Sequence, residues 1–320
     1  MGKLAFVFPG QGAQAVGMGK DIVEADPEAK RVYEAADEAL GMALSRIILE
    51  GPEAELKATY NTQPALLTTS IAYLERFQAR YGLKPDYVAG HSLGEYSALV
   101  AAGVMSFADA VRTVRARGEF MEAAVPSGQG AMAAVLGADR EALKSLCASI
   151  SGEAGIVELA NLNCPGQIVI SGSVAGVQAV GERGKEAGAK RVIPLEVSGP
   201  FHSSMMRPAS EKLAGVLSGI EMARAAIPVV ANVNARPVQD PAEIRSLLVE
   251  QVYSSVLWED SVVWLIAEGV DTFVEFGSGS VLAGLIKKNR PQRYGAFDQQ
   301  LGSAREISNR IRVTPRVGVA

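Results

Sequence analysis

The chain has only two cysteines and two histidines among its 320 residues. A zinc site of the usual cysteine and histidine kind can hardly be assembled from so few ligands, so we predict no bound metal. An exported protein of this length more often carries several paired cysteines. The scarcity of cysteine therefore favours a reducing cytoplasm as the location.

Long apolar runs and an excess of charge of one sign are also missing. The N-terminal apolar run at residues 4–8 is followed by Pro9, and it is too short for a signal peptide or a membrane span. The 31 Lys and Arg residues nearly balance the 35 Asp and Glu residues. We therefore predict that the protein uses neither a membrane nor a nucleic acid as a partner.

The sequence does contain short apolar runs that alternate with longer amphipathic stretches. Runs of this kind are typical of buried parallel strands, and the stretches are typical of helices that cover a sheet. The pattern predicts an α/β fold with a parallel sheet. Strands are expected at residues 4–8, 87–91, 228–232 and 272–276, and helices at 27–40, 63–81 and 106–124.

The middle of the chain has a different pattern, which begins after a glycine-rich linker at residues 127–130. The expected order is a strand, a helix, two strands, a helix and a strand, at residues 131–136, 139–150, 155–161, 167–171, 174–186 and 190–195. This βαββαβ order is that of a ferredoxin-like unit. We therefore predict a small domain at 128–196, inserted into a large domain made of 1–127 and 197–320.

A candidate nucleophile lies in the sequence GHSLG at residues 90–94. It matches the G-x-S-x-G elbow, follows an apolar run and opens a helical pattern, which is the strand-turn-helix setting that the elbow requires. The turn would expose the Ser92 hydroxyl, and the helix N-terminus behind it favours developing negative charge. The alternative is an ordinary turn between a strand and a helix.

A serine nucleophile needs a base, and the chain offers only two histidines. His91 directly precedes Ser92, and consecutive residues at a strand end point to opposite faces. His202 lies in a loop before the helical pattern at 205–217, where the helix dipole would keep the ring neutral. His202 is therefore the better candidate, although a lone loop histidine is often a surface or packing residue.

One arginine falls at the edge of an apolar helical stripe. On the expected helix 106–124, Arg117 lies beside the stripe, whereas Arg112 and Arg115 lie farther round. An arginine that points toward an interior needs an anion to meet. The anion is either a buried Asp or Glu of the protein or a bound substrate.

Together these residues resemble a known family, the malonyl-CoA:acyl carrier protein transacylases of bacterial-type fatty-acid synthesis. The resemblance covers nearly the whole chain. It rests on FPGQG at 8–12, GHSLGE at 90–95, Arg117, NLNCPGQ at 161–167, GPFHS at 199–203 and GSGSVL at 277–282. It implies a large hydrolase-like α/β subdomain that carries an inserted ferredoxin-like subdomain.

The resemblance also implies the chemistry. Ser92 would attack the thioester of malonyl-CoA with His202 as the base, and the phosphopantetheine thiol of acyl carrier protein would then take the malonyl group. The backbone N–H groups of Gln11 and Leu93 would hold the oxyanion, and Arg117 would bind the malonyl carboxylate. Malonyl-CoA enters as a substrate, no cofactor is bound permanently, and a monomer is expected.

Two positions depart from related patterns. True α/β hydrolases have an acidic residue between the nucleophile and the histidine, whereas in this family a backbone carbonyl orients the histidine. The matching residue is Gln251, and Glu196 is an alternative. Ser280 stands where many relatives have lysine, which puts in doubt a charge contribution to phosphate binding. We expect the turn at Gly277 to serve packing rather than coenzyme binding.

Acyl carrier proteins are acidic, so docking would require a local basic patch. The candidates, each of which could equally be a solvated surface residue, are Lys185, Lys190, Arg191, Lys287, Lys288 and Arg290.

Other functions remain open at this point. They are a serine esterase or thioesterase, a free-standing acyltransferase of a polyketide synthase, and a docking module without catalysis. A phosphate-binding loop is excluded, because Gly19-Lys20 is followed by Asp21 and not by Ser or Thr.

Overall fold

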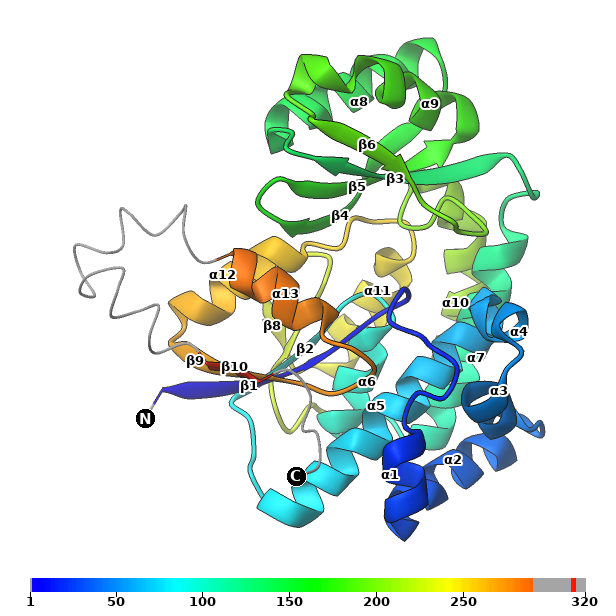
Figure 1. Cartoon of the computed structure of the whole chain (residues 1–320), viewed down its shortest axis with the longest axis vertical. Helices are drawn as coiled ribbons and strands as arrows, with labels where there is room; N and C mark the ends of the chain where they lie inside the picture. Colours follow the sequence, from blue (N-terminus) through cyan, green and yellow to red (C-terminus); the bar gives the residue numbers. More distant parts are fainter. Residues whose placement is uncertain (1, 290–311, 315–320) are drawn as a thin grey trace.

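The computed structural model describes residues 2–289 and 312–314, and its larger part is built on a six-stranded sheet (Figure 1). The strand order is β10-β9-β1-β2-β7-β8, and all neighbours are parallel except β7 and β8. The strands are β1 (Lys3–Phe8), β2 (Tyr87–Gly90), β7 (Val229–Val230), β8 (Pro237–Val238), β9 (Val270–Glu275) and β10 (Arg312–Thr314). The predicted α/β fold with a parallel sheet is confirmed, although the strand expected at 228–232 is only two residues long.

Helices cover both faces of this sheet. Side chains alternate along β1, so that Phe6 and Phe8 pack in one core while Ala5 and Val7 pack in another. The first core also takes side chains from α5, α6 and α7, and the second from α12 and α13. The helices of this part are α1 (Lys20–Ala25), α2 (Pro27–Leu40), α3 (Leu44–Glu50), α4 (Glu53–Lys57), α5 (Thr59–Tyr81), α6 (Gly94–Ala101), α7 (Phe107–Ala123), α10 (Arg207–Ser218), α11 (Pro241–Gln251), α12 (Trp258–Ala267) and α13 (Val281–Lys288).

The middle of the chain forms a second sheet, at the top of Figure 1. Its antiparallel strands lie in the order β4-β5-β3-β6 and pack with α8 and α9 on a separate core. The elements are β3 (Gly130–Leu136), α8 (Arg140–Glu153), β4 (Val157–Cys164), β5 (Gln167–Ser173), α9 (Val174–Arg183), the 3₁₀ helix η1 (Gly184–Ala187) and β6 (Arg191–Pro194). They follow the predicted βαββαβ order. The division into domains at 128 and 196 stays a prediction.

Backbone hydrogen bonds connect β4 of the second sheet to the loop that follows α11 in the main part of the chain. The N–H of Val256 donates to the Ala160 carbonyl at 2.8 Å, and the Leu162 N–H donates to the Val256 carbonyl at 2.9 Å. Arg140 on α8 also pairs with Asp260 on α12 at 2.8 Å. These contacts hold β4 beside the loop that follows α11.

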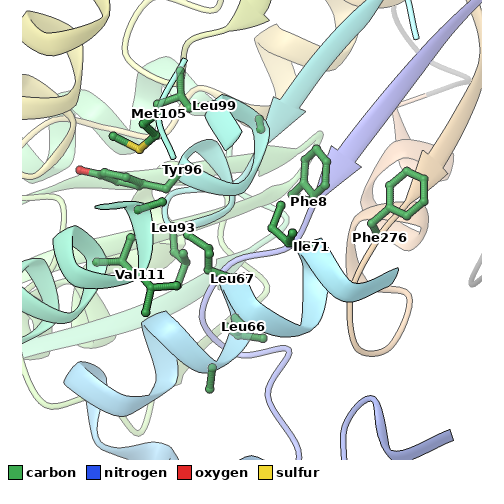
Figure 2. Close-up of a cluster of buried hydrophobic side chains, with 14 of the residues drawn as sticks. Phe8, Leu66, Leu67, Ile71, Leu93, Tyr96, Leu99, Met105, Val111 and Phe276 are labelled. Atoms are coloured by element: carbon green, nitrogen blue, oxygen red, sulfur yellow. The ribbon is translucent and has the colours of Figure 1, made fainter. Parts of the chain in front are cut away.

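The core on one side of the main sheet fixes where α5, α6 and α7 lie. Figure 2 shows side chains from all three regions packed together, with Phe8 and Phe276 at the sheet side. α7 approaches the start of α5 closely at Gly118, where an added Cβ would lie 2.6 Å from the Cα of Tyr60. Gly118 therefore allows the two helices to approach closely enough to share a site.

We expect Gly118→Ala to destabilise the protein by about 1–3 kcal/mol, because the new methyl group meets backbone that cannot yield. The matched control is Gly215→Ala on α10, where nothing lies within 4 Å of the added Cβ. That substitution should stabilise the protein by about 0.5–1 kcal/mol through helix propensity. Thermal unfolding of both variants measures the difference, and equal midpoints would contradict the tight α5–α7 packing.

Candidate active site

Ser92 lies on a sharp turn between β2 and α6. Its φ of 51° is in the left-handed region, which few non-glycine residues adopt. The turn is held by glycines, since a Cβ on Gly90 or Gly94 would overlap backbone atoms of Gly94 or Phe8. Strain of this kind costs about 1–3 kcal/mol and concentrates at functional sites. The strand-turn-helix setting expected for the GHSLG sequence is therefore present.

The Ser92 hydroxyl contacts the ring of His202, with Oγ 2.7 Å from Nε2. His202 precedes the 3₁₀ helix η2 (Ser204–Met206) and also has a positive φ, 59°. Its Nδ1–H donates to the backbone carbonyl of Gln251 at 2.8 Å, which leaves Nε2 as the proton acceptor. Glu196, the alternative orienting residue, does not fill this role. Its side chain is exposed, and the Gln251 carbonyl already accepts the Nδ1–H of His202.

The His202 ring is neutral at physiological pH. Burial and, to a lesser extent, the nearby positive charge of Arg117 lower its pKa to about 3, against the opposing effect of the hydrogen bond to the Gln251 carbonyl. A neutral ring with a free Nε2 lone pair can accept the serine proton.

His91 takes no part in this contact. Its Nε2 lies 2.8 Å from Oδ1 of Asn163, and its ring packs against Trp258 with the centroids 5.8 Å apart. Burial lowers its pKa as well. The expected opposite orientations of His91 and Ser92 are therefore observed.

Arg117 is 1% exposed, and its guanidinium reaches the nucleophile. Nη2 donates to Ser92 Oγ at 3.1 Å and to Gln251 Oε1 at 3.0 Å, and Nη1 donates to Gln63 Oε1 at 2.8 Å. In contrast, Arg112 and Arg115 form ion pairs with half-exposed or exposed carboxylates on the outer face of α7. The predicted placement of Arg117 at the edge of the buried stripe is therefore observed.

Among the described residues, no carboxylate pairs directly with Arg117, although the buried Glu95 lies close enough to counteract the lowering of its guanidinium pKa by burial. Within residues 2–289, its three hydrogen-bond acceptors are all neutral, and no ion pair includes it. Its Nε is buried and has no hydrogen-bond partner there. A buried guanidinium with a spare donor, beside a candidate nucleophile, is suited to bind an external carboxylate.

The two expected oxyanion donors lie on either side of the elbow. Leu93 directly follows Ser92, and the loop that contains Gln11 packs on the elbow, because a Cβ on Gly10 would overlap the His91 carbonyl. Among the described residues, no acceptor binds the backbone N–H of Gln11 or of Leu93. Both groups are free to donate to a substrate oxygen.

Sequence reasoning missed a network of amide side chains behind the nucleophile. Asn232 Oδ1 accepts from the Ser92 backbone N–H at 2.7 Å, and its Nδ2 donates to the Gly90 carbonyl at 2.7 Å. The Gln251 side chain donates to the Ser92 carbonyl at 3.0 Å. These bonds hold the strained turn from both sides. The position of Asn232 at the carboxyl end of an expected strand next to β2 was an available signal.

Two further residues of the site were also missed. Gln63 on α5 binds Arg117, and Glu95 is a buried carboxylate that accepts from Gln251 Nε2 at 2.8 Å. Burial raises the pKa of Glu95 to about 7. Glu95 stood in the sequence only as the last residue of the elbow motif, and nothing there indicated that it is buried.

A cavity of about 650 Å³ opens at His202 between the two sheets. This volume is in the range of small-molecule sites. From the second sheet and its helices, Arg140 and Lys144 of α8 and Glu158 of β4 line the cavity. From the main part of the chain, Glu250 and Tyr253 line it. His202 therefore borders a space that both parts of the chain enclose, whereas Ser92 and Arg117 are not among the residues that line it.

The turn at Gly277 serves packing. A Cβ on Gly277 would lie 2.5 Å from the ring of Pro9, and the carboxylate of Glu275 accepts from the first N–H groups of α13, those of Leu282 and Ala283. The helix terminus is thus already occupied by an anion of the protein. Ser280 precedes α13 and makes no capping hydrogen bond through its side chain.

The structure describes five of the six residues of the predicted basic patch, all except Arg290. Lys288 on α13 donates to Gln167 of β5 at 3.2 Å, so the end of α13 lies beside the second sheet. Arg290 lies outside the described residues.

In residues 2–289 and 312–314, no group of three His, Cys, Asp or Glu side chains lies close enough to hold a metal ion. In the same part of the chain, no helix has the length and apolar character needed to span a membrane.

Comparisons with known proteins agree with one another. The acyl transferase domain family matches residues 5–306. Over 288 residues, the chain is 59% identical to the malonyl CoA-acyl carrier protein transacylase of Bacillus subtilis, with 90% of both chains covered. The corresponding protein of Staphylococcus aureus is 49% identical, with 90% of this chain and 92% of that protein covered.

Solved structures give the same result. An acyl carrier protein S-malonyltransferase from Vibrio cholerae has a TM-score of 0.87 and 44% identity, over 90% of this chain and 94% of that chain. A malonyl transacylase solved in complex with the acyl carrier protein of a type II polyketide synthase has a TM-score of 0.87 and 44% identity, over 90% and 93%.

The low pKa of His202 gives a direct prediction. Because the chain has only two histidines, ¹⁵N NMR can follow each imidazole: the His202 ring should stay neutral from pH 8 down to pH 5, and the His91 ring should titrate below its ordinary pKa. The matched control is the same protein in concentrated guanidinium chloride, where both rings should titrate near the ordinary pKa of about 6.5. A ring that protonates near pH 6.5 in the folded protein, and disappears in His202→Ala, would contradict the geometry.

Proposed function

The chain belongs to the acyl transferase domain family, and we propose that it transfers the malonyl group of malonyl-CoA to the phosphopantetheine thiol of acyl carrier protein through a malonyl ester of Ser92. It is an acyltransferase. The transfer supplies malonyl groups for chain elongation in fatty-acid synthesis.

The observation that carries the malonyl assignment is the position of Arg117. In a malonyl thioester, one methylene group separates the carboxylate from the carbonyl that the nucleophile attacks. A group that binds this carboxylate must therefore lie beside the nucleophile, and Nη2 of Arg117 lies 3.1 Å from Ser92 Oγ. Nε and Nη2 form one edge of the guanidinium fork, which suits a two-pronged pair with a carboxylate.

Acylation follows from the contacts of Ser92. His202 Nε2 takes the hydroxyl proton as Ser92 Oγ attacks the thioester carbonyl, and the negative charge that develops on the carbonyl oxygen is held by the N–H groups of Gln11 and Leu93. The loss of one such donor typically costs about two to three powers of ten in rate. The proton then passes to the coenzyme A sulfur, which leaves.

Transfer reverses these steps with a different thiol. The phosphopantetheine thiol of acyl carrier protein gives its proton to His202 and attacks the malonyl ester, and Ser92 recovers the proton as it leaves. The Gln251 carbonyl keeps Nδ1–H in place through both steps, so Nε2 alone exchanges the proton. The reaction requires no cofactor, because malonyl-CoA enters as a substrate.

The acyl carrier protein that accepts the malonyl group could instead belong to polyketide synthesis. One similar structure is a malonyl transacylase bound to the acyl carrier protein of a type II polyketide synthase, which favours a role in polyketide synthesis as the second candidate. Phe201 is buried beside His202 and would crowd a 2-methyl branch on the acyl group. One methyl group is worth only about 1–3 kcal/mol, so selectivity for malonyl over methylmalonyl is a matter of degree.

Simple ester or thioester hydrolysis fits the site less well, because its substrates have no carboxylate for Arg117. We place the reaction in the cytoplasm and in a monomer, with a catalytic subdomain made of 1–127 and 197–320 and a smaller one of 128–196. The acidic acyl carrier protein would dock on basic residues, among them Lys190, Arg191 and Lys288.

Labelling tests the covalent step. Brief incubation with radiolabelled malonyl-CoA should leave about one malonyl group per chain, and proteolysis with mass spectrometry should place it on Ser92. Ser92→Ala should take up no label and lose transfer by several powers of ten. The mechanism would be abandoned if Ser92→Ala still transferred malonyl groups at a comparable rate.

The role of Arg117 predicts a difference between two substrates. Arg117→Ala should reduce kcat/KM for malonyl-CoA by about a hundredfold or more, since a charge-assisted pair is lost, and should affect acetyl-CoA far less. Arg117→Lys is the matched control: it keeps the charge but not the fork, and should restore only part of the loss. Equal losses for the two substrates would remove the carboxylate-binding role.

A further inference from the structure

Glu95 is a carboxylate buried behind the nucleophile, on the first turn of α6. It is 2% exposed, and its Oε2 accepts from Gln251 Nε2 at 2.8 Å and from the Asn232 backbone N–H at 3.0 Å. Within residues 2–289 it forms no ion pair. A buried carboxylate is costly unless a positive charge compensates it, so its presence beside the reacting groups requires a reason.

The compensating charge is Arg117, and it acts through the side chain of Gln251. The amide oxygen of Gln251 accepts from Arg117 Nη2 at 3.0 Å, and its amide nitrogen donates to Glu95. One amide thus connects the cation to the anion. In the absence of substrate and above pH 7, where Glu95 is ionised, the two charges compensate each other within the buried site.

A malonyl group at Arg117 would bring a second carboxylate into this site. One cation would then face two anions in a region where water screens charge poorly. Protonation of Glu95 relieves this excess. No described residue donates to its Oε1, so a proton can occupy that oxygen while Oε2 keeps both of its hydrogen bonds.

We propose that Glu95 is a positioning residue that acts on Arg117 through Gln251, and that binding of a malonyl carboxylate at Arg117 is coupled to uptake of one proton from solvent by Glu95. This inference rests on the proposed function and adds to it. It makes recognition of the malonyl group dependent on pH.

The other ionisable groups that face the site do not titrate in the same range. The pKa of Glu95 is raised to about 7 by burial, against the lowering effects of its hydrogen bonds from Gln251 and Asn232 and of the charge on Arg117. The pKa of His202 is lowered to about 3, that of His91 is lowered by burial, and that of Tyr96 is raised by burial. Arg117 stays protonated throughout.

The polar side chains that face the site from neighbouring elements are neutral. Gln63 projects from α5, Gln251 from α11, and Asn232 follows β7. Among the described groups around the site, Glu95 is therefore the one that changes charge between pH 6 and pH 9.

The sign of the effect follows from linkage. Below pH 7 Glu95 already carries its proton, so malonyl binding is at its tightest and takes up no further proton. Above pH 7 binding must draw a proton from solvent, so the affinity for the malonyl group falls as the pH rises. The fall ends once the pH exceeds the raised pKa that Glu95 has in the complex. Each unit by which binding raises the pKa of Glu95 corresponds to a tenfold loss of affinity, and we expect a loss of about tenfold between pH 6 and pH 9.

Calorimetry on the Ser92→Ala protein measures the proton directly. Malonyl-CoA should bind this variant without reacting, and titration at pH 8 in two buffers of different ionisation enthalpy gives the number of protons taken up. Acetyl-CoA is the matched ligand, because it carries the same phosphates and lacks the carboxylate. Malonyl-CoA should take up about 0.4 of a proton beyond acetyl-CoA, as a pKa raised by about one unit from 7 requires at pH 8. Equal proton counts would overturn the proposal.

The second arm adds Glu95→Gln to Ser92→Ala. The amide oxygen of the new side chain can still accept from Gln251 and Asn232, so this variant removes the charge and keeps the hydrogen bonds. Its affinity for malonyl-CoA should be independent of pH and should show no excess proton. A pH dependence like that of the Ser92→Ala protein would assign the proton elsewhere and overturn the proposal.

Different results would contradict the proposed function and the inference about Glu95. Malonyl-CoA that binds no better than acetyl-CoA at pH 6, together with an unlabelled Ser92 in the unsubstituted protein, would contradict the proposed function. Preferential malonyl binding without an excess proton would contradict the Glu95 inference alone. If Glu95→Gln does not fold, the proton count in the Ser92→Ala protein still decides.

Discussion

Arg117 keeps a positive charge inside the protein, 3.1 Å from the nucleophile oxygen, without a carboxylate in direct contact. Most of the site depends on this constraint. Burial and the Arg117 charge together lower the pKa of His202. Gln63 and Gln251 supply the neutral acceptors that make burial of the guanidinium tolerable, and its Nε has no partner among the described residues. We propose that a site built in this way selects an acyl group that carries its own anion.

The fold supplies the rigidity that this arrangement needs. Glycines allow β2, α6 and the loop after β1 to lie in direct contact, so Ser92 is held in a strained turn by main-chain packing and by Asn232. Gln251 serves four groups at once: its carbonyl orients His202, its amide oxygen binds Arg117, and its amide nitrogen donates to Glu95 and to the Ser92 carbonyl. A single residue at the end of α11 therefore couples the base, the carboxylate site and the buried acid.

The sequence predicts the elements whose signals are local. The period of apolar residues predicted the α/β class and the βαββαβ order, and the GHSLG sequence predicted the turn at Ser92. The apolar stripe on the expected helix 106–124 predicted that Arg117 lies at the edge of the buried face. The residues that were missed, Gln63, Glu95 and Asn232, act through contacts between segments far apart in the chain. An uncharged amide or a single acid has no pattern that reveals such a contact before the chain folds.

The most direct test of the account is a crystal structure of the protein after brief exposure to malonyl-CoA. The account predicts an ester on Ser92 Oγ, the ester carbonyl oxygen within hydrogen-bond distance of the Gln11 and Leu93 N–H groups, and the malonyl carboxylate paired with the Nε and Nη2 edge of Arg117. A malonyl ester whose carboxylate points into solvent, with Arg117 still bound only to Gln63 and Gln251, would contradict it.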